Sequence, residues 1–155
     1  MSTFPGVTVL LIDDNVELLD LMTRSLHYIG HFTVERASDG VEGLEKAMTL
    51  RPACIVVDVM MPGLNGYQFV RALRGDPVSA GIPIVMLTAL AQDFNQLAGF
   101  LAGADHYLIK PVKIQDLIAA IQEAIALSHS ERDRRQRTLA EQDDGGGNHD
   151  GGSDA

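Results

Sequence analysis

The stretch Ala53–Gly66, ACIVVDVMMPGLNG, decides how the rest of the chain is interpreted. Its apolar run, Cys54–Val57, has a single carboxylate, Asp58, at its far end, and Pro62 begins a segment rich in turn residues. A short, continuous apolar run that ends in turn residues is typical of a strand buried on both faces of a parallel sheet. Open α/β sheets bind their ligands at the carboxyl ends of such strands. Since a lone aspartate there more often only caps a loop, the other strands decide whether Asp58 is functional.

Size and composition limit the class of protein. The chain has 155 residues, of which 46% are apolar and 21% charged, as expected for one soluble domain with a full core. A formal net charge of −9 argues against nucleic acid as a direct partner. No apolar stretch is long enough to span a membrane, and the amino terminus lacks a basic signal region, so we expect a cytoplasmic protein without a membrane partner. The single cysteine, Cys54, is interpreted as a small core residue.

Strand and helix patterns alternate along the chain. The strand candidates are Val7–Ile12, Phe32–Arg36, Cys54–Val57, Ile84–Leu87 and His106–Ile109. The helix candidates carry apolar stripes at Leu19, Met22, Leu26 and Ile29; Val41, Leu44 and Met48; Phe69, Val70 and Leu73; Phe94, Leu97 and Leu101; and Ile114, Leu117, Ile118, Ile121 and Ile125. Asn15 is a candidate N-cap of the first helix, and Asp39–Gly40 opens the second. Strict alternation with short connections predicts a three-layer (βα)5 fold of the α/β class, a doubly wound parallel sheet with helices on both faces.

Five polar side chains follow strands that end at the same edge of the predicted sheet, namely Asp13, Asp14, Asp58, Thr88 and Lys110. Carboxylate pairs about 5 Å apart repel by roughly 3 kcal/mol at an effective dielectric constant near 20. Protonation, spreading into solvent or a divalent cation would each relieve this repulsion. A site made of carboxylate oxygens suits Mg²⁺ better than zinc. With Mg²⁺ present, the lysine and the threonine hydroxyl form a cradle for phosphoryl oxygens, and a carboxylate can act as the nucleophile.

Four motifs in this order resemble the receiver domain of two-component response regulators. They are LLIDDN at 10–15, VVDVMMPGLNG at 56–66, VMLTA at 85–89 and GADHYLIKP at 103–111. The resemblance extends over about residues 7–127. It implies a flavodoxin-like fold with strand order 2-1-3-4-5, in agreement with the alternation of strands and helices.

The resemblance also implies roles for individual residues. Asp58 would be the phosphoacceptor, and its phosphoryl group would come from a histidine kinase or a histidine phosphotransfer protein. Asp14 and Asp58 would bind Mg²⁺ directly, together with the backbone carbonyl of Met60, and Asp13 would act mainly through water. Lys110 would pair with the phosphoryl group. The protein would thus be a phosphoacceptor signalling domain rather than an enzyme with a separate substrate.

A switch in the partner surface is implied as well. Thr88 would form a hydrogen bond with the phosphoryl group, and Tyr107 would be the aromatic residue that turns inward when Thr88 moves. The surface that changes would be the fourth helix, fifth strand and fifth helix, and the Lys110–Pro111 peptide bond would be cis. The expected fourth and fifth helices are nearly free of Lys and Arg, and His106 stands where relatives are often acidic. These departures favour a monomer or a weak homodimer.

The domain assignment is a receiver domain at 1–128 and a charged extension with a disordered Gly/Asp-rich tail at 129–155. Three alternatives to a stand-alone receiver remain. One is a receiver fragment of a larger multidomain regulator whose output domain is absent. Another is a Mg²⁺-dependent flavodoxin-like enzyme or nucleotide binder, disfavoured because no Gly-rich phosphate loop follows Ile12. The third is a degenerate receiver that is not phosphorylated, which the full acidic set opposes.

Overall fold

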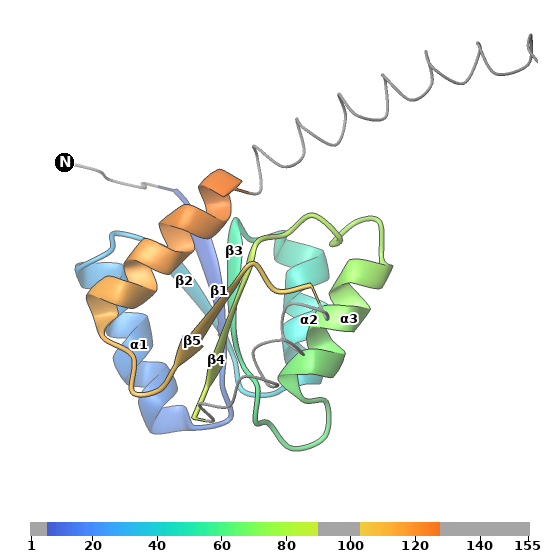
Figure 1. Cartoon of the computed structure of the whole chain (residues 1–155), viewed down its shortest axis with the longest axis horizontal. Coiled ribbons are helices and arrows are strands. Elements are labelled where there is room, and N and C mark those ends of the chain that lie inside the picture. Colours follow the sequence, from blue (N-terminus) through green and yellow to red (C-terminus); the bar gives the residue numbers. More distant parts are fainter. Residues whose placement is uncertain (1–5, 90–102, 128–155) are drawn as a thin grey trace, which may run out of the picture.

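Five parallel strands form one sheet in the order β2-β1-β3-β4-β5 (Figure 1). The computed structural model of the chain describes residues 6–89 and 103–127. The strands are β1 (Thr8–Ile12), β2 (Thr33–Ala37), β3 (Cys54–Asp58), β4 (Ile84–Thr88) and β5 (His106–Ile109). The predicted α/β class, the parallel doubly wound sheet and its strand order are therefore confirmed.

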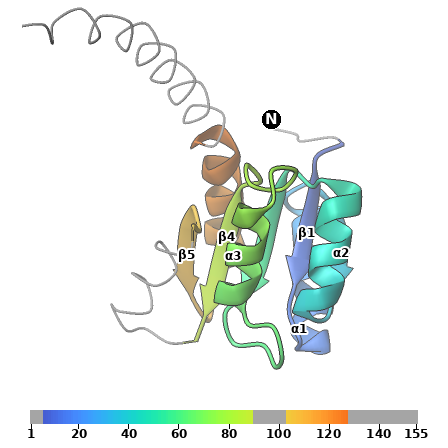
Figure 2. The ribbon, with the colours of Figure 1, turned by 90° about the vertical axis from the view of Figure 1, so that its right-hand side faces the viewer.

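Helices cover both faces of the sheet (Figures 1 and 2). They are α1 (Val16–Tyr28), α2 (Gly40–Leu50), α3 (Gly66–Gly75) and an unlabelled helix at residues 114–127. The helix predicted from Phe94, Leu97 and Leu101 lies outside the described residues, as does the extension at 129–155. Within the described ranges, no helix has the length and apolar character that a membrane crossing requires.

Two apolar clusters separate the three layers. Along β1, Val9 and Leu11 pack with α1 and the 114–127 helix, whereas Leu10 and Ile12 pack with α2 and α3. This alternation follows from the two-residue period of a strand. All five residues of β3 and of β4 are buried, as their continuous apolar sequences predicted. The ends of the central strands are therefore held in place from both faces.

Polar side chains fix where the helices begin. Asn15, Asp39 and Asn65 are N-caps, and each side chain accepts a hydrogen bond from the backbone N–H three residues later, at 3.1, 2.8 and 2.9 Å. At α3 the side chain of Gln68 also accepts from the Asn65 backbone N–H, which completes a capping box. α1, α2 and α3 thus start four, three and eight residues after the preceding strand ends, on the edge where the acidic residues lie.

Two helix stripes differ from their predicted form. Ile29 is 54% exposed and lies just beyond the end of α1, and Val41 in α2 is 60% exposed. The buried residues of α2 are small, with Gly43 so close to β1 that an added Cβ would lie 2.6 Å from Ile12 Cδ1. Apolar periodicity misses such a contact because it weights large side chains, whereas close helix–sheet packing here requires small ones.

Gly66 tests how tightly α3 is packed against the end of β3. An alanine Cβ at this position would lie 2.6 Å from the Asp58 carbonyl oxygen and 2.8 Å from Val59 Cα, both backbone atoms. We expect Gly66→Ala to lower the free energy of unfolding by about 1–3 kcal/mol, because α3 must shift to relieve the clash. Urea unfolding followed by circular dichroism measures the change.

Gly75→Ala is the matched control at the other end of α3. Nothing lies within 4 Å of its added Cβ. Its free energy of unfolding should stay within about 0.5 kcal/mol of the wild type. Equal losses in the two variants would contradict the close packing at Gly66.

Candidate functional site

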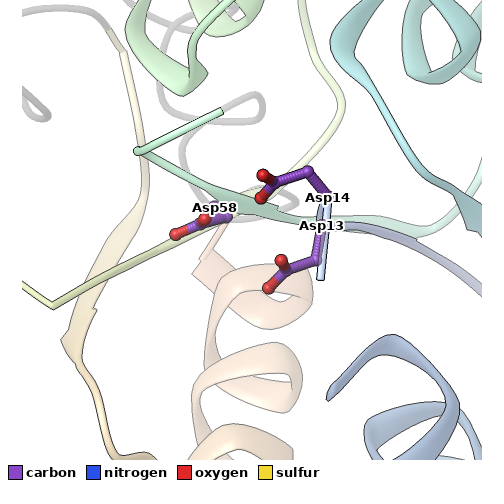
Figure 3. A group of neighbouring side chains, drawn as sticks. All are labelled: Asp13, Asp14 and Asp58. Carbon is purple, nitrogen blue, oxygen red and sulfur yellow. The ribbon is translucent and has the colours of Figure 1, made fainter. Parts of the chain in front are cut away.

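Three carboxylates from two strands gather at one edge of the sheet (Figure 3). Asp13 and Asp14 follow β1, and Asp58 is the last residue of β3. The two strands are hydrogen-bonded neighbours, and Ile12 pairs with Val57. As a result, one oxygen from each carboxylate lies within 4.8 Å of the others. The convergence predicted from the parallel sheet is present in the structure.

The three acids differ in their surroundings. Asp13 is 1% exposed and Asp58 is 5% exposed, whereas Asp14 is exposed. The Asn15 backbone N–H donates to Asp13 Oδ1 at 2.9 Å, which holds that carboxylate in the loop that caps α1. Two buried carboxylates and an exposed one give a site that is closed toward the core and open toward solvent.

Lys110 lies between the two buried acids. Its Nζ is 3.2 Å from Asp13 Oδ2 and 3.2 Å from Asp58 Oδ1. The Lys110 backbone N–H donates to the Thr88 carbonyl at 2.6 Å, so the loop after β5 is tied to the end of β4. The Lys110–Pro111 peptide bond is cis, as the family resemblance implied. A single ammonium group therefore serves two carboxylates from different strands.

Burial raises the pKa of the Asp58 carboxyl. Lys110 and a backbone hydrogen bond from Met60 act in the opposite direction, while the charge of Asp13 adds to the rise. For Lys110, burial lowers the pKa, but the charges of Asp58 and Asp13 and their hydrogen bonds raise it more. The net effect on the pKa of Lys110 is therefore set by attraction to the two carboxylates, whereas the net effect on the pKa of Asp58 is set by desolvation and by repulsion from Asp13. Without a metal ion, the carboxylate form of Asp58 is therefore less favourable in the folded protein than in water.

The other residues predicted from the sequence lie close to this cluster. Thr88 is the last residue of β4 and is fully buried, and in the neighbouring strand Asp58 pairs with Leu87. Met60 directs an exposed side chain to solvent, with 60% of its surface accessible. The roles implied for these residues, including the Met60 carbonyl as a ligand, remain predictions.

Tyr107 has a partner that the sequence analysis missed. It lies in β5, is partly buried against the cluster under α2 and α3, and its hydroxyl oxygen is 3.4 Å from that of Tyr67 in α3. The sequence signal for Tyr67 was only an aromatic residue in the first turn of a helix. Nothing in a single sequence pairs that position with a strand so much later in the chain.

The donor set fits a hard divalent cation. All three candidate ligands are carboxylates, their oxygens lie within 4.8 Å of one another, and one of the three is exposed. Mg²⁺ prefers oxygen ligands, binds through one or two carboxylates and keeps several waters, which the open side of this cluster allows. The same oxygens with Lys110 surround a position where a phosphoryl group would find positive charge.

Comparison with known proteins identifies the family. The family pattern described as "Response regulator receiver domain" matches residues 9–122. The chain is 38% identical to the response regulator MprA of Mycobacterium ulcerans over 135 residues, which are 87% of this chain and 57% of that protein. It is 38% identical to the DNA-binding dual master transcriptional regulator RpaA of Synechocystis, over 74% of this chain and 47% of that protein. The chain thus spans about half the length of these curated relatives.

Solved structures agree in fold along most of the chain. The chemotaxis protein CheY4 of Vibrio cholerae matches with a TM-score of 0.72 and 33% identity, over 76% of this chain and 98% of that one. The receiver domain of the Francisella response regulator 1452 matches with a TM-score of 0.73 and 29% identity, over 79% and 99% of the two chains.

Replacing Asp58 by asparagine should stabilise the cation-free protein at neutral pH. A carboxyl whose pKa is higher in the folded than in the unfolded state costs stability as the pH rises from the unfolded to the folded pKa, and the loss is complete above the folded pKa. Asparagine removes that cost. We expect Asp58→Asn in EDTA at pH 7 to raise the thermal midpoint by a few degrees. Acidification should shrink the difference, because Asp58 of the wild type then becomes protonated.

Asp14→Asn is the control, because Asp14 lies in the same cluster but is exposed. Its thermal midpoint should change less than that of Asp58→Asn. A lower midpoint for Asp58→Asn than for the wild type at pH 7 would contradict the assigned balance of burial, attraction and repulsion.

Proposed function

The chain belongs to the response regulator receiver domain family, and we propose that it accepts a phosphoryl group on Asp58 from a histidine kinase or a histidine phosphotransfer protein. Phosphorylation would then change which protein the domain binds, so its role is signalling rather than turnover of a separate substrate. The observation that carries the proposal is the contact of one ammonium, Lys110 Nζ, with both Asp13 and Asp58 inside the acidic cluster.

The transfer itself requires little chemistry from the protein. A carboxylate oxygen of Asp58 attacks phosphorus in the donor, an O–P bond forms, and the P–N bond to the donor imidazole breaks. The imidazole leaves with the electron pair of that bond and takes up a proton. Lys110 is placed to follow the phosphoryl group, because its ammonium already contacts Asp58 Oδ1 at 3.2 Å. The Thr88 hydroxyl, at the end of the adjacent strand, would bond another phosphoryl oxygen.

The carboxylates of Asp13, Asp14 and Asp58, with the Met60 carbonyl, would hold a Mg²⁺ ion. When bound, it supplies positive charge that offsets the repulsion between the acids and an incoming phosphoryl group. The pKa of Asp58 supports this role, since its carboxylate is unfavourable until more positive charge is brought near. Because the Asp14 side chain is exposed, it could coordinate or release such an ion without disturbing the core.

An apolar cavity beside Lys110 suits the protein that donates the phosphoryl group. It has a volume of about 560 Å³ and lies between α1 and the 114–127 helix, with Lys110 itself in its lining. Leu18, Leu21 and Ile114 are among its apolar lining residues, and Leu21 is 63% exposed. A donor whose apolar side chains pack here would bring its phosphohistidine to the neighbouring acidic cluster. The expected monomeric or weakly dimeric state and cytoplasmic location remain predictions.

Phosphorylation by a small donor tests the proposed acceptor. Incubation with acetyl phosphate and Mg²⁺ should add the mass of one phosphoryl group to the wild type, measured by intact-mass spectrometry. Asp58→Ala should show no addition, nor should the wild type in EDTA. Lys110→Met should react more slowly, on the order of 10²-fold, because a preorganised positive group at the reacting centre is lost.

A phosphoryl group on Asp58→Ala, or none on the wild type, would overturn the proposal. Circular dichroism of each variant shows whether the fold is retained. Asp14→Asn serves as an intermediate case, since it removes one candidate ligand and leaves the nucleophile in place.

Docking of the donor protein is tested at Leu21. Leu21→Ala should lower the transfer rate from a phosphohistidine protein that labels the wild type, by about tenfold if Leu21 is a central contact. Labelling by acetyl phosphate should be unchanged, because that donor does not need the cavity. Val41→Ala is the control, as Val41 is similarly exposed at 60% but lies on α2, at the opposite face of the sheet. Equal effects of the two variants would exclude the cavity as the docking surface.

A further inference from the structure

Two tyrosine hydroxyls meet across the α2–α3 side of the molecule. The hydroxyl oxygens of Tyr67 and Tyr107 are 3.4 Å apart, and either can be the donor. Both rings are partly buried against the same apolar cluster. The separation exceeds the usual O–H···O distance of about 2.7–2.8 Å, so this is a weak hydrogen bond. A bond of this strength biases the orientation of a ring without fixing it.

Tyr67 is attached to the phosphoacceptor through the backbone. The preceding residue, Gly66, donates its N–H to the Val59 carbonyl at 3.0 Å, and its Cα faces the Asp58 carbonyl so closely that no Cβ would fit. The capping box formed by Asn65 and Gln68 then fixes the first turn of α3. The Tyr67 backbone therefore keeps its place relative to Asp58, and its partly buried ring extends from a fixed point of the helix.

Tyr107 is attached to the other half of the site. It pairs with Met86 in β4. Lys110 follows three residues later, and its backbone N–H donates a hydrogen bond to the Thr88 carbonyl. β5 is one of the two edge strands of the sheet and is bonded only to β4 among the described strands. The ring of Tyr107 thus lies on a strand with one strand neighbour, three residues before Lys110.

We propose that Tyr67 is a positioning residue for Tyr107, whose ring it holds in the orientation of the unphosphorylated protein through the hydroxyl–hydroxyl contact. This proposal rests on the proposed function, because it concerns how that site controls the β5 surface. The hydrogen bond is present with Asp58 unmodified, and the expected turn of Tyr107 on phosphorylation would lose it, so the bond opposes that turn. Phosphorylation would have to break it when Tyr107 turns.

Burial, followed by the hydrogen bond and the charge of Tyr107, raises the pKa of the Tyr67 hydroxyl. Tyr67 therefore keeps its proton throughout the neutral range, and the pair remains able to form its hydrogen bond. Both rings pack on one apolar surface, which keeps the two hydroxyl groups near each other.

Tyr67→Phe tests the proposal directly, because it removes one hydroxyl and keeps the ring. The chain has three tyrosines and no tryptophan. Isotope labelling of the tyrosine rings therefore gives one set of NMR signals for each tyrosine, and each set is assigned by its absence in a single Tyr→Phe variant. We expect the Tyr107 signal to shift in Tyr67→Phe without any ligand. Beryllofluoride with Mg²⁺ mimics a phosphoryl group on a carboxylate, so it can be titrated against the protein. We also expect the beryllofluoride concentration that converts half of the protein to fall roughly two- to tenfold, the range for loss of one hydrogen bond.

Two further variants separate this bond from other contacts of Tyr67. Tyr107→Phe removes the same hydrogen bond from the other side, so the double variant Tyr67→Phe/Tyr107→Phe should shift the midpoint no further than either single one. Tyr28→Phe is the control, because Tyr28 is 74% exposed in α1, and neither quantity should change.

An unchanged or higher beryllofluoride midpoint in Tyr67→Phe would overturn the proposal, even if the Tyr107 signal shifted. Additive effects in the double variant would also overturn it. If the wild type takes up neither a phosphoryl group nor beryllofluoride, the proposed function fails. The ring signal of Tyr107 in the ligand-free variants then decides alone whether Tyr67 positions it.

Discussion

One ammonium group shared by two buried carboxylates is the interaction on which this site depends. Asp13 and Asp58 are almost completely inaccessible, and each has Lys110 Nζ at 3.2 Å. Two buried anions so close together would repel strongly in a medium of low dielectric constant. The lysine relieves this repulsion incompletely, since burial still keeps the pKa of Asp58 raised. What remains is a preference for added positive charge beside Asp58, built into the cation-free fold.

The sheet order explains why these groups meet. β1 and β3 are neighbours in the middle of the sheet, so their carboxyl ends place Asp13 and Asp58 side by side. β4 then separates β3 from β5, and Lys110 reaches back across its end with a backbone bond to Thr88. Buried apolar residues on both faces fix the two central strands. The connection from β1 to α1, Asp13–Asn15, contains two acids and no glycine, so it lacks the Gly-rich backbone turn that binds a nucleotide phosphate. This geometry favours a phosphoacceptor over a nucleotide-binding enzyme.

The sequence was sufficient to predict the positions of the strands and the convergence of the acids and Lys110 at one edge of the sheet, because both follow from patterns within single segments. β5 has the predicted bounds His106–Ile109, and the acids and Lys110 meet as parallel strands require. Periodicity failed where packing needs small residues, as at Gly43, and where a helix ended before its stripe, as at Ile29. It also gave no sign of the contact between Tyr67 and Tyr107, since such a pair depends on the angle between α3 and the sheet.

A second missed contact shows that α3 is linked to β5 at both of its ends. Near the end of α3, the Arg74 guanidinium pairs with Asp105, just before β5. It also donates to the backbone carbonyls of Ala80, Ile82 and Gly103. Asp105 in turn accepts from the Ile84 N–H at 2.7 Å, which joins the start of β4 to the same group. Several bonds thus fix the start of β5, whereas nearer the site the described contact between α3 and this strand is the weak one between the hydroxyls of Tyr67 and Tyr107. A change in charge at the acidic cluster would act on β5 through Lys110, whose ammonium contacts Asp13 and Asp58. Tyr107 is the second residue of β5, so it lies between the start of the strand, held by Arg74 and Asp105, and the lysine that contacts the acids.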